Sequence, residues 1–192
     1  MTQVDKKYKR QSMLFGFLIF VGVLLIIIAI LASIKVVDYA EYTNKQHGVT
    51  MKYPVFWEKV DAPAAGALVV FRAPKMTELD LFLPNVNIAF VPIEKEIDSA
   101  RFNEKVISQV TGTFRGHIKV LHTGPVRVAG RRGYSLSYIG HDDQNRDDYF
   151  KYLHRWVVVG KRAYILTYVA IEKDFDENLW IVKAMMKSFA IQ

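Results

Sequence analysis

The sequence has 192 residues, which is enough for one globular domain and a small additional element. It contains no cysteine, which excludes a disulfide framework, a lipidated cysteine anchor and thiol chemistry. The formal net charge is +7, but residues 1–37 hold five cations and one acid, so residues 38–192 carry only +3. Because no basic stripe is interleaved with aromatic residues, nucleic-acid binding is not expected.

A long apolar segment follows a basic N-terminus. The 22 residues at 13–34 contain no charge and no proline. A helix of that length, at about 1.5 Å per residue, spans a hydrocarbon core of about 30 Å. A cleavable signal peptide is the alternative, but its apolar core is only about 7–15 residues long. We therefore expect an uncleaved signal anchor.

The charges that flank this segment predict its orientation. Four cations precede it and only Lys35 follows it closely, so the positive-inside rule places the N-terminus in the cytoplasm. We expect a single-pass membrane protein with three regions. These are a cytoplasmic basic tail at 1–12, a transmembrane signal anchor at 13–37 and a periplasmic or otherwise extracytoplasmic domain at 38–192.

The first half of the outer domain is predicted to form strands followed by one helix. Residues 38–47 are polar and predict a connector. Alternating apolar and polar residues then predict half-buried strands, at 49–53, 56–60, 68–71 and 85–91. From Asp98 to Phe114 apolar residues recur at helical spacing, which predicts an amphipathic helix that packs on the sheet.

The second half is predicted to form strands joined by tight turns and to end in a helix. The strands are expected at 117–121, 126–128, 134–139, 149–159 and 162–171, with a hairpin turn at Gly160-Lys161. Asp174, followed three positions later by Glu177, predicts a helix start of the capping-box type. This order of elements predicts an α+β fold, an α/β/α sandwich with a central antiparallel sheet.

The loop after residue 140 is the strongest candidate for a metal site. Asp143, Asn145 and Asp147 stand at alternate positions and would present three hard oxygens to calcium, as at the start of an EF-hand. The rest of that motif is missing, since its sixth position is Asp148 rather than glycine and its twelfth is His154 rather than glutamate. A solvated turn is the favoured interpretation, because Asp and Asn side chains bond their own backbone in turns. An acidic docking surface is the second interpretation, and weak calcium binding is the third.

Reactive groups do not converge in a recognisable pattern. The sequence lacks a G-x-S-x-G elbow and the two glycine-rich phosphate loops. Its five histidines are not spaced as zinc ligands, and each is predicted to be a surface or strand residue. We therefore expect no enzyme activity and no tightly bound cofactor.

Several motifs of the outer domain resemble those of one known family. Residues 48–57, GVTMKYPVFW, resemble its opening G-x-x-x-x-Y-P-x-x-W. Three later features also fit: the strand motif Gly130-x-x-Gly133-Tyr134-x-Leu136-x-Tyr138, the strand AYILTY at 163–168, and a closing helix that ends in Ser188-Phe189. Together these motifs resemble those of the PsbP-like family, over roughly residues 41–191. The resemblance implies an α/β/α sandwich that has no shared catalytic apparatus and mostly binds and stabilises larger protein assemblies.

The anchor and the resemblance together predict the class of function. The leading hypothesis is a non-catalytic accessory subunit that docks on and stabilises a larger membrane complex, and the resemblance suggests a photosynthetic or respiratory one. The expected partners are the membrane and other protein subunits. A stand-alone periplasmic or cell-surface binding domain with a weak divalent-cation site is the alternative, and a chaperone for a secreted or membrane protein is a further one.

Overall fold

The computed structural model describes residues 20–26, 37–61, 66–75, 77, 82–94, 97–113, 118–141 and 149–192. The chain divides into two units, Met1–Val37 and Asp38–Gln192. In the first unit residues 20–26 are helical, and the rest of the predicted anchor at 13–34 lies outside the described residues. Within the described ranges no helix is both long enough and apolar enough to cross a membrane.

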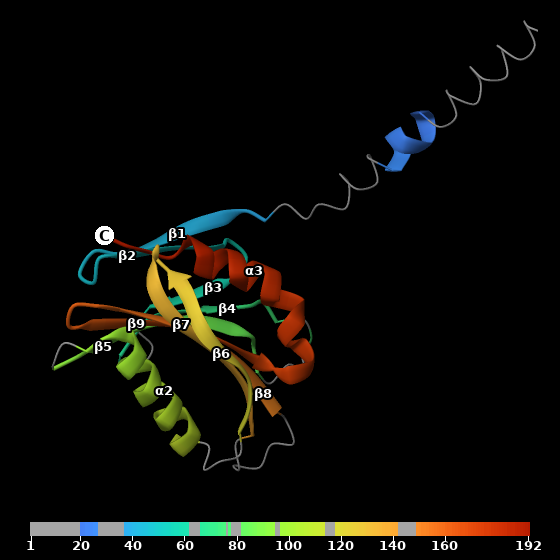
Figure 1. The fold of residues 1–192 in the computed structure, drawn as a ribbon. Helices are drawn as coiled ribbons and strands as arrows, with labels where there is room; N and C mark the ends of the chain where they lie inside the picture. The colour runs from blue at the N-terminus through green and yellow to red at the C-terminus, as the bar shows by residue number, and fades with distance from the viewer. Residues whose placement is uncertain are drawn as a thin grey trace, which may run out of the picture. The chain divides into compact units, whose positions relative to one another are not determined.

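The second unit contains two antiparallel sheets (Figure 1). The larger sheet has the order β3-β4-β5-β9-β8-β7-β6 and the smaller one the order β1-β2-β10. The strands of the larger sheet are β3 (Glu58–Asp61), β4 (Ala67–Arg72), β5 (Asn85–Pro92), β6 (Ile118–Val128), β7 (Arg131–His141), β8 (Tyr149–Val159) and β9 (Arg162–Ile171). Those of the smaller sheet are β1 (Tyr39–Asn44), β2 (Val49–Pro54) and β10 (Ala190–Ile191).

The helices are α2 (Ser99–Thr113) and α3 (Phe175–Ser188), the second preceded by the 3₁₀ turn η1 (Glu172–Asp174). The predicted helix at 98–114 therefore forms almost as expected. Asp98 caps it, because the backbone N–H of Arg101 donates to the Asp98 carboxylate at 2.8 Å.

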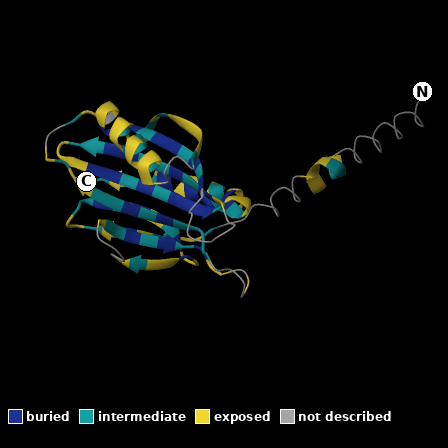
Figure 2. Cartoon of the chain, turned by 90° about the horizontal axis from the view of Figure 1, so that it is seen from below, coloured by how far each residue is buried: buried dark blue, intermediate teal, exposed yellow. Residues whose placement is uncertain are grey.

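Both faces of the larger sheet are covered, so neighbouring residues of a central strand are buried on opposite faces (Figure 2). On β9, Tyr164, Leu166 and Tyr168 contribute to one buried cluster, whereas Ala163 contributes to the other. The first cluster lies between the large sheet, the small sheet and α3, and the second lies under α2. The α+β class and the antiparallel pairing are thus confirmed.

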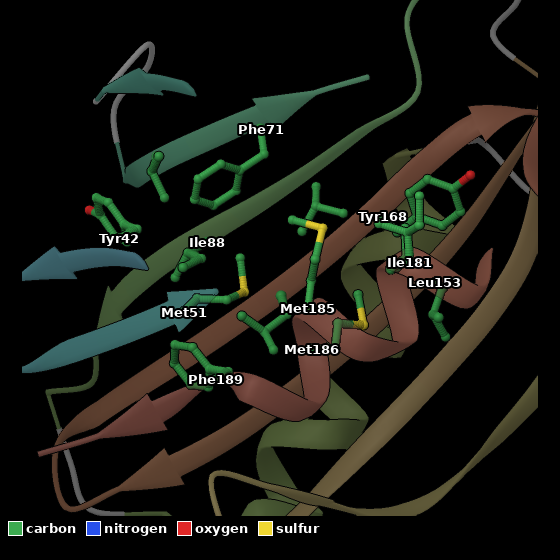
Figure 3. Packing of buried hydrophobic residues seen from close by; sticks show 14 of the residues in the cluster. Tyr42, Met51, Phe71, Ile88, Leu153, Tyr168, Ile181, Met185, Met186 and Phe189 are labelled. Carbon is green, nitrogen blue, oxygen red and sulfur yellow. The ribbon is translucent and has the colours of Figure 1, made fainter. Parts of the chain in front are cut away.

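The main core is formed by α3 together with strands of both sheets. Figure 3 shows Met185 and Met186 of α3 directed toward side chains from both sheets, among them Met51 and Ile88. Tyr168 closes one end of this core, and its hydroxyl donates to the carbonyl of Phe175 at 2.8 Å. Burial raises the pKa of Tyr168, as is expected for a phenol that must stay neutral in an apolar core.

Three local predictions were wrong, each for a physical reason. The polar connector at 38–47 contains a strand, β1, because its backbone pairs with β2 along the whole of that strand. The two predicted strands at 117–121 and 126–128 are one continuous strand, β6, which passes through Gly124 and Pro125. Asp174 makes no side-chain cap, because it ends η1 with helical dihedral angles instead of the extended backbone that a capping residue needs.

The β6–β7 hairpin closes through two residues in the left-handed region. Ala129 has a φ of 49° and Gly130 a φ of 73°, as a type I′ turn requires. The predicted turn at Gly160-Lys161 is confirmed, because Val159 pairs with Arg162 and Gly160 has a φ of 59°.

Candidate functional site

The predicted metal residues Asp143, Asn145 and Asp147 lie outside the described residues. The strands on either side are described, and they pair antiparallel from His141 opposite Tyr149. The loop therefore joins two neighbouring strands of the larger sheet, as predicted. Elsewhere in the described part of the chain, no three His, Asp or Glu side chains gather as metal ligands would.

A basic cleft lies between α3 and the β6 edge of the larger sheet. Its volume is about 400 Å³. It is lined by Leu121, His122, Pro125 and Val126 of β6, Ser135 and Ser137 of β7, Lys151, Leu153 and Arg155 of β8, and Phe175, Leu179 and Lys183 of α3. We call this set of residues the basic cleft.

The periodicities of strand and helix bring these side chains together. Ser135 pairs with Arg155 and Ser137 with Leu153 across β7 and β8, and directly paired residues point to the same face of a sheet. On α3, residues 175, 179 and 183 are four positions apart and form one stripe. Sheet and helix thus each present a mixed apolar and cationic row to the same space.

Arg155 is a half-buried cation for which no carboxylate partner is observed among the described residues. Its Nε atom is buried and has no hydrogen-bond partner among the described residues, and burial lowers the pKa of its guanidinium. A buried N–H that lacks an acceptor costs free energy, and an interaction with an acceptor would offset that cost. An anion in the cleft would supply that interaction.

Lys151 is the one cation of the cleft for which a carboxylate partner is observed within the described structure. Its Nζ lies 3.3 Å from an oxygen of Asp176, whose side chain is 74% exposed. The same nitrogen lies 4.5 Å above the centroid of the Phe175 ring. The Lys151 side chain itself is only 20% exposed, so solvent screens this ion pair mainly from the side of Asp176.

The positive charge extends over the neighbouring strands. β6, β7 and β8 contain no acidic residue and carry six cations, Lys119, Arg127, Arg131, Arg132, Lys151 and Arg155. Arg131 and Arg132 are exposed at the start of β7. An acidic partner would therefore be attracted to this whole region before it reached the cleft.

A histidine is held between two hydroxyl groups on the opposite face of the same strands. His154 is within hydrogen-bond distance of the Tyr138 hydroxyl through Nε2 (3.1 Å) and of the Thr167 hydroxyl through Nδ1 (2.9 Å). Its ring is nearly parallel to those of Tyr138 and Tyr152, with interplanar angles of 8° and 3°. Burial lowers the pKa of His154 to about 4, so the ring is neutral at pH 7. His154 is therefore part of the packing under α2 and does not line the basic cleft.

The basic cleft could not be predicted from the sequence motifs, because its residues come from four separate elements. One signal was available: the absence of Asp and Glu from the three strands β6 to β8. The chemistry that the cleft supports is binding. It offers cations, hydroxyl groups and apolar contacts, as needed to hold a carboxylate or another anion beside an apolar group.

Comparison with solved structures shows where this architecture occurs. Cyanobacterial PsbP (CyanoP) from Synechocystis sp. PCC 6803 is 18% identical with a TM-score of 0.58, over 83% of this chain and 96% of that one. LpqN of Mycobacterium tuberculosis, involved in cell envelope biogenesis, is 11% identical with a TM-score of 0.61, over 82% and 92%. The Saccharomyces cerevisiae Ran-binding protein Mog1p is 9% identical with a TM-score of 0.54, over 81% and 96%.

These likenesses concern the fold, since all three identities are low. A comparison with curated proteins finds no match. The sequence itself matches the PsbP family over residues 37–191, which is almost the whole second unit. The resemblance seen in the sequence motifs is thereby confirmed, and the chain belongs to the PsbP family.

Proposed function

We propose that this protein is a non-catalytic accessory subunit that is anchored in a membrane and docks on an acidic protein surface through the basic cleft. The observation that carries the proposal is Arg155, whose buried Nε atom has no hydrogen-bond partner in the described structure, in a cleft that Lys151 and Lys183 also line. An acidic side chain or terminal carboxylate of a partner would complete this arrangement.

The membrane location in this proposal is supported by the sequence. The apolar segment 13–34 and the cations before it motivate a single anchor with the C-terminal domain outside the cytoplasm. Membership of the PsbP family is consistent with a binding or accessory role. A larger membrane complex, photosynthetic or respiratory, is the partner that we infer from these two properties.

The proposal is tested on the full chain in its native membranes. After gentle solubilisation and native electrophoresis, the protein should migrate with other chains in a complex far heavier than its own 22.1 kDa. The double variant Arg155→Gln, Lys183→Gln removes two cleft cations and should release most of the protein from that complex.

A matched control removes the same charge outside the cleft. Arg162 on β9 and Lys187 on α3 are both exposed and do not line the cleft, so Arg162→Gln, Lys187→Gln should leave the complex intact. If both double variants release the protein equally, net charge and not the cleft governs the association. A lone band for the unaltered protein would support the stand-alone binding domain instead.

A further inference from the structure

Strand β6 forms an open edge of the larger sheet, next to the basic cleft. It has 11 residues, and among the described elements no strand pairs with its outer side. The opposite edge strand, β3, has only four residues. Exposed edges of this length pair readily with another chain unless they are covered or blocked.

β6 also exposes large apolar side chains to solvent, although they make no contribution to the core. Val120 is 47% exposed and Leu121 is 42% exposed. The pairing of β6 with β7 shifts between Val120 and His122, so Leu121 has no partner on β7. Leu121 lies instead along the cleft, where a partner side chain can contact it.

Pro125 indicates which backbone groups face outward. A proline is accepted in an edge strand where its nitrogen faces away from the neighbouring strand. Residues two positions apart in a strand present their backbone N–H groups to the same side. Thr123 pairs with Leu136, two positions from the pair of Pro125 with Tyr134. The N–H group of Thr123 therefore points away from β7, as the nitrogen of Pro125 does. This donor is available to an added strand.

The register connects this edge with the cleft. His122 and Gly124 pair with Ser137 and Ser135, so these residues point to the face that α3 covers. An extended segment laid along β6 would direct every second side chain to that same face. Those side chains would enter the region of Arg155 and Lys183.

Charge decides what kind of segment fits. With six cations and no acid on β6 to β8, a second copy of this strand would be repelled, whereas an acidic segment would be attracted. We propose that β6 accepts an extended segment of a partner protein as an additional strand, with alternate acidic side chains directed into the basic cleft. This inference rests on the proposed docking function and specifies its mode of binding.

The test measures peptide binding to the full chain in neutral detergent. The probe is a fluorescent eight-residue peptide of alternating Glu and Val, compared by anisotropy with an alternating Lys and Val peptide. A third peptide keeps the Glu and Val sequence but carries N-methyl groups on alternate residues, which block strand pairing without altering charge. The acidic peptide should bind, the Lys peptide should not, and N-methylation should weaken binding about tenfold.

Two variants test the edge from the protein side. Thr123→Pro removes the outward N–H and should weaken binding of the acidic peptide about tenfold, whereas Thr123→Ala should leave it within about twofold. Thermal unfolding of both variants checks that the fold is retained, and the N-methyl peptide decides the question if Thr123→Pro does not fold.

The outcomes separate this inference from the docking function on which it rests. If N-methylation and Thr123→Pro have no effect but Arg155→Gln, Lys183→Gln weakens binding, strand addition is overturned and the cleft stands. A different result would be that the acidic peptide does not bind, while the protein binds phosphatidylglycerol vesicles equally well in the cleft variant Arg155→Gln, Lys183→Gln and in the control Arg162→Gln, Lys187→Gln. That result would overturn both strand addition and docking through the cleft.

Discussion

The carbonyl oxygen of Trp156 occupies the place that a β-carbon on Gly133 would need. Gly133 is buried in β7, and that β-carbon would also meet a methyl group of Val128 at 3.2 Å. Both neighbours are fixed, one as backbone of β8 and the other as part of the main core. Only glycine fits here without displacing a strand.

Gly133→Ala should therefore destabilise the domain by about 1–3 kcal/mol, the range for overpacked cores. The measurement is the midpoint of chemical unfolding, followed by circular dichroism. Gly112→Ala is the control, because nothing lies within 4 Å of that β-carbon on α2, and it should be neutral or stabilising by up to about 1 kcal/mol. Equal midpoints for the two variants would contradict the packing argument.

His154 should make stability depend on pH. Its pKa in the folded chain is about 4, below the ordinary value of 6.5, because burial disfavours the charged ring. The unfolded chain therefore takes up the proton first as the pH falls. Stability should be complete above about pH 6.5 and should decrease by up to about 3 kcal/mol as the pH approaches 4.

The check is a series of unfolding curves between pH 4 and pH 7.5. His154→Gln keeps polar atoms near Tyr138 and Thr167 but does not titrate, so this variant should lose most of that pH dependence. A pH slope that is unchanged in the variant would assign the acid sensitivity to other groups.

Arg155 should reduce stability in the isolated chain. Replacing it by methionine keeps most of the stem and removes a half-buried charge whose Nε atom has no described hydrogen-bond partner. We expect Arg155→Met to raise the free energy of unfolding by about 1 kcal/mol while it weakens association with the partner. Arg162→Met, at an exposed position, should change neither quantity. Thermal unfolding measures the stability, and native electrophoresis of the same samples measures the association with the partner. If Arg155→Met is less stable than the unaltered chain, the guanidinium already makes favourable interactions within the fold.

The loop at 142–148 yields a prediction about metal binding. Asp143, Asn145 and Asp147 form only the first half of a calcium motif, so we expect at most weak calcium binding. Calorimetric titration should give no heat at micromolar calcium. The thermal stability of Asp143→Ala, Asp147→Ala should respond to calcium as the unaltered chain does. A tight, stoichiometric heat that the double variant abolishes would establish a metal site.

Sequence patterns predicted most of the larger sheet but not its edge. The long apolar run of β9 was predicted as a strand, and both of its faces are buried, with Tyr164 in one cluster and Ala163 in the other. The prediction was incomplete at β6, because exposed edge positions need not alternate and Pro125 there costs no ladder hydrogen bond. β1 was missed for a related reason, since its burial pattern includes only one fully buried residue, Tyr42.

The candidate site was less predictable than the fold, because it depends on residues distant in the sequence. Ser135 and Arg155 are brought together by the register of β7 and β8, and Lys183 joins them only when α3 lies on the sheet. Leu179 of α3 is half-buried beside that cleft. No local sequence motif indicates that these residues lie close together in the folded chain.

The acid-free strands give the outer region a strong internal asymmetry of charge. Of the 21 cations and 18 acids in residues 38–192, six cations and no acid lie on β6, β7 and β8. The other residues of that region thus hold 15 cations and 18 acids, a net charge of −3 against +6 on these strands. An acidic partner would attract the positive strands first, so the domain would be oriented with β6 toward the partner before the two proteins make contact. Orientation would then be selected during the encounter itself, and salt would slow the formation of the complex more than it would speed its dissociation.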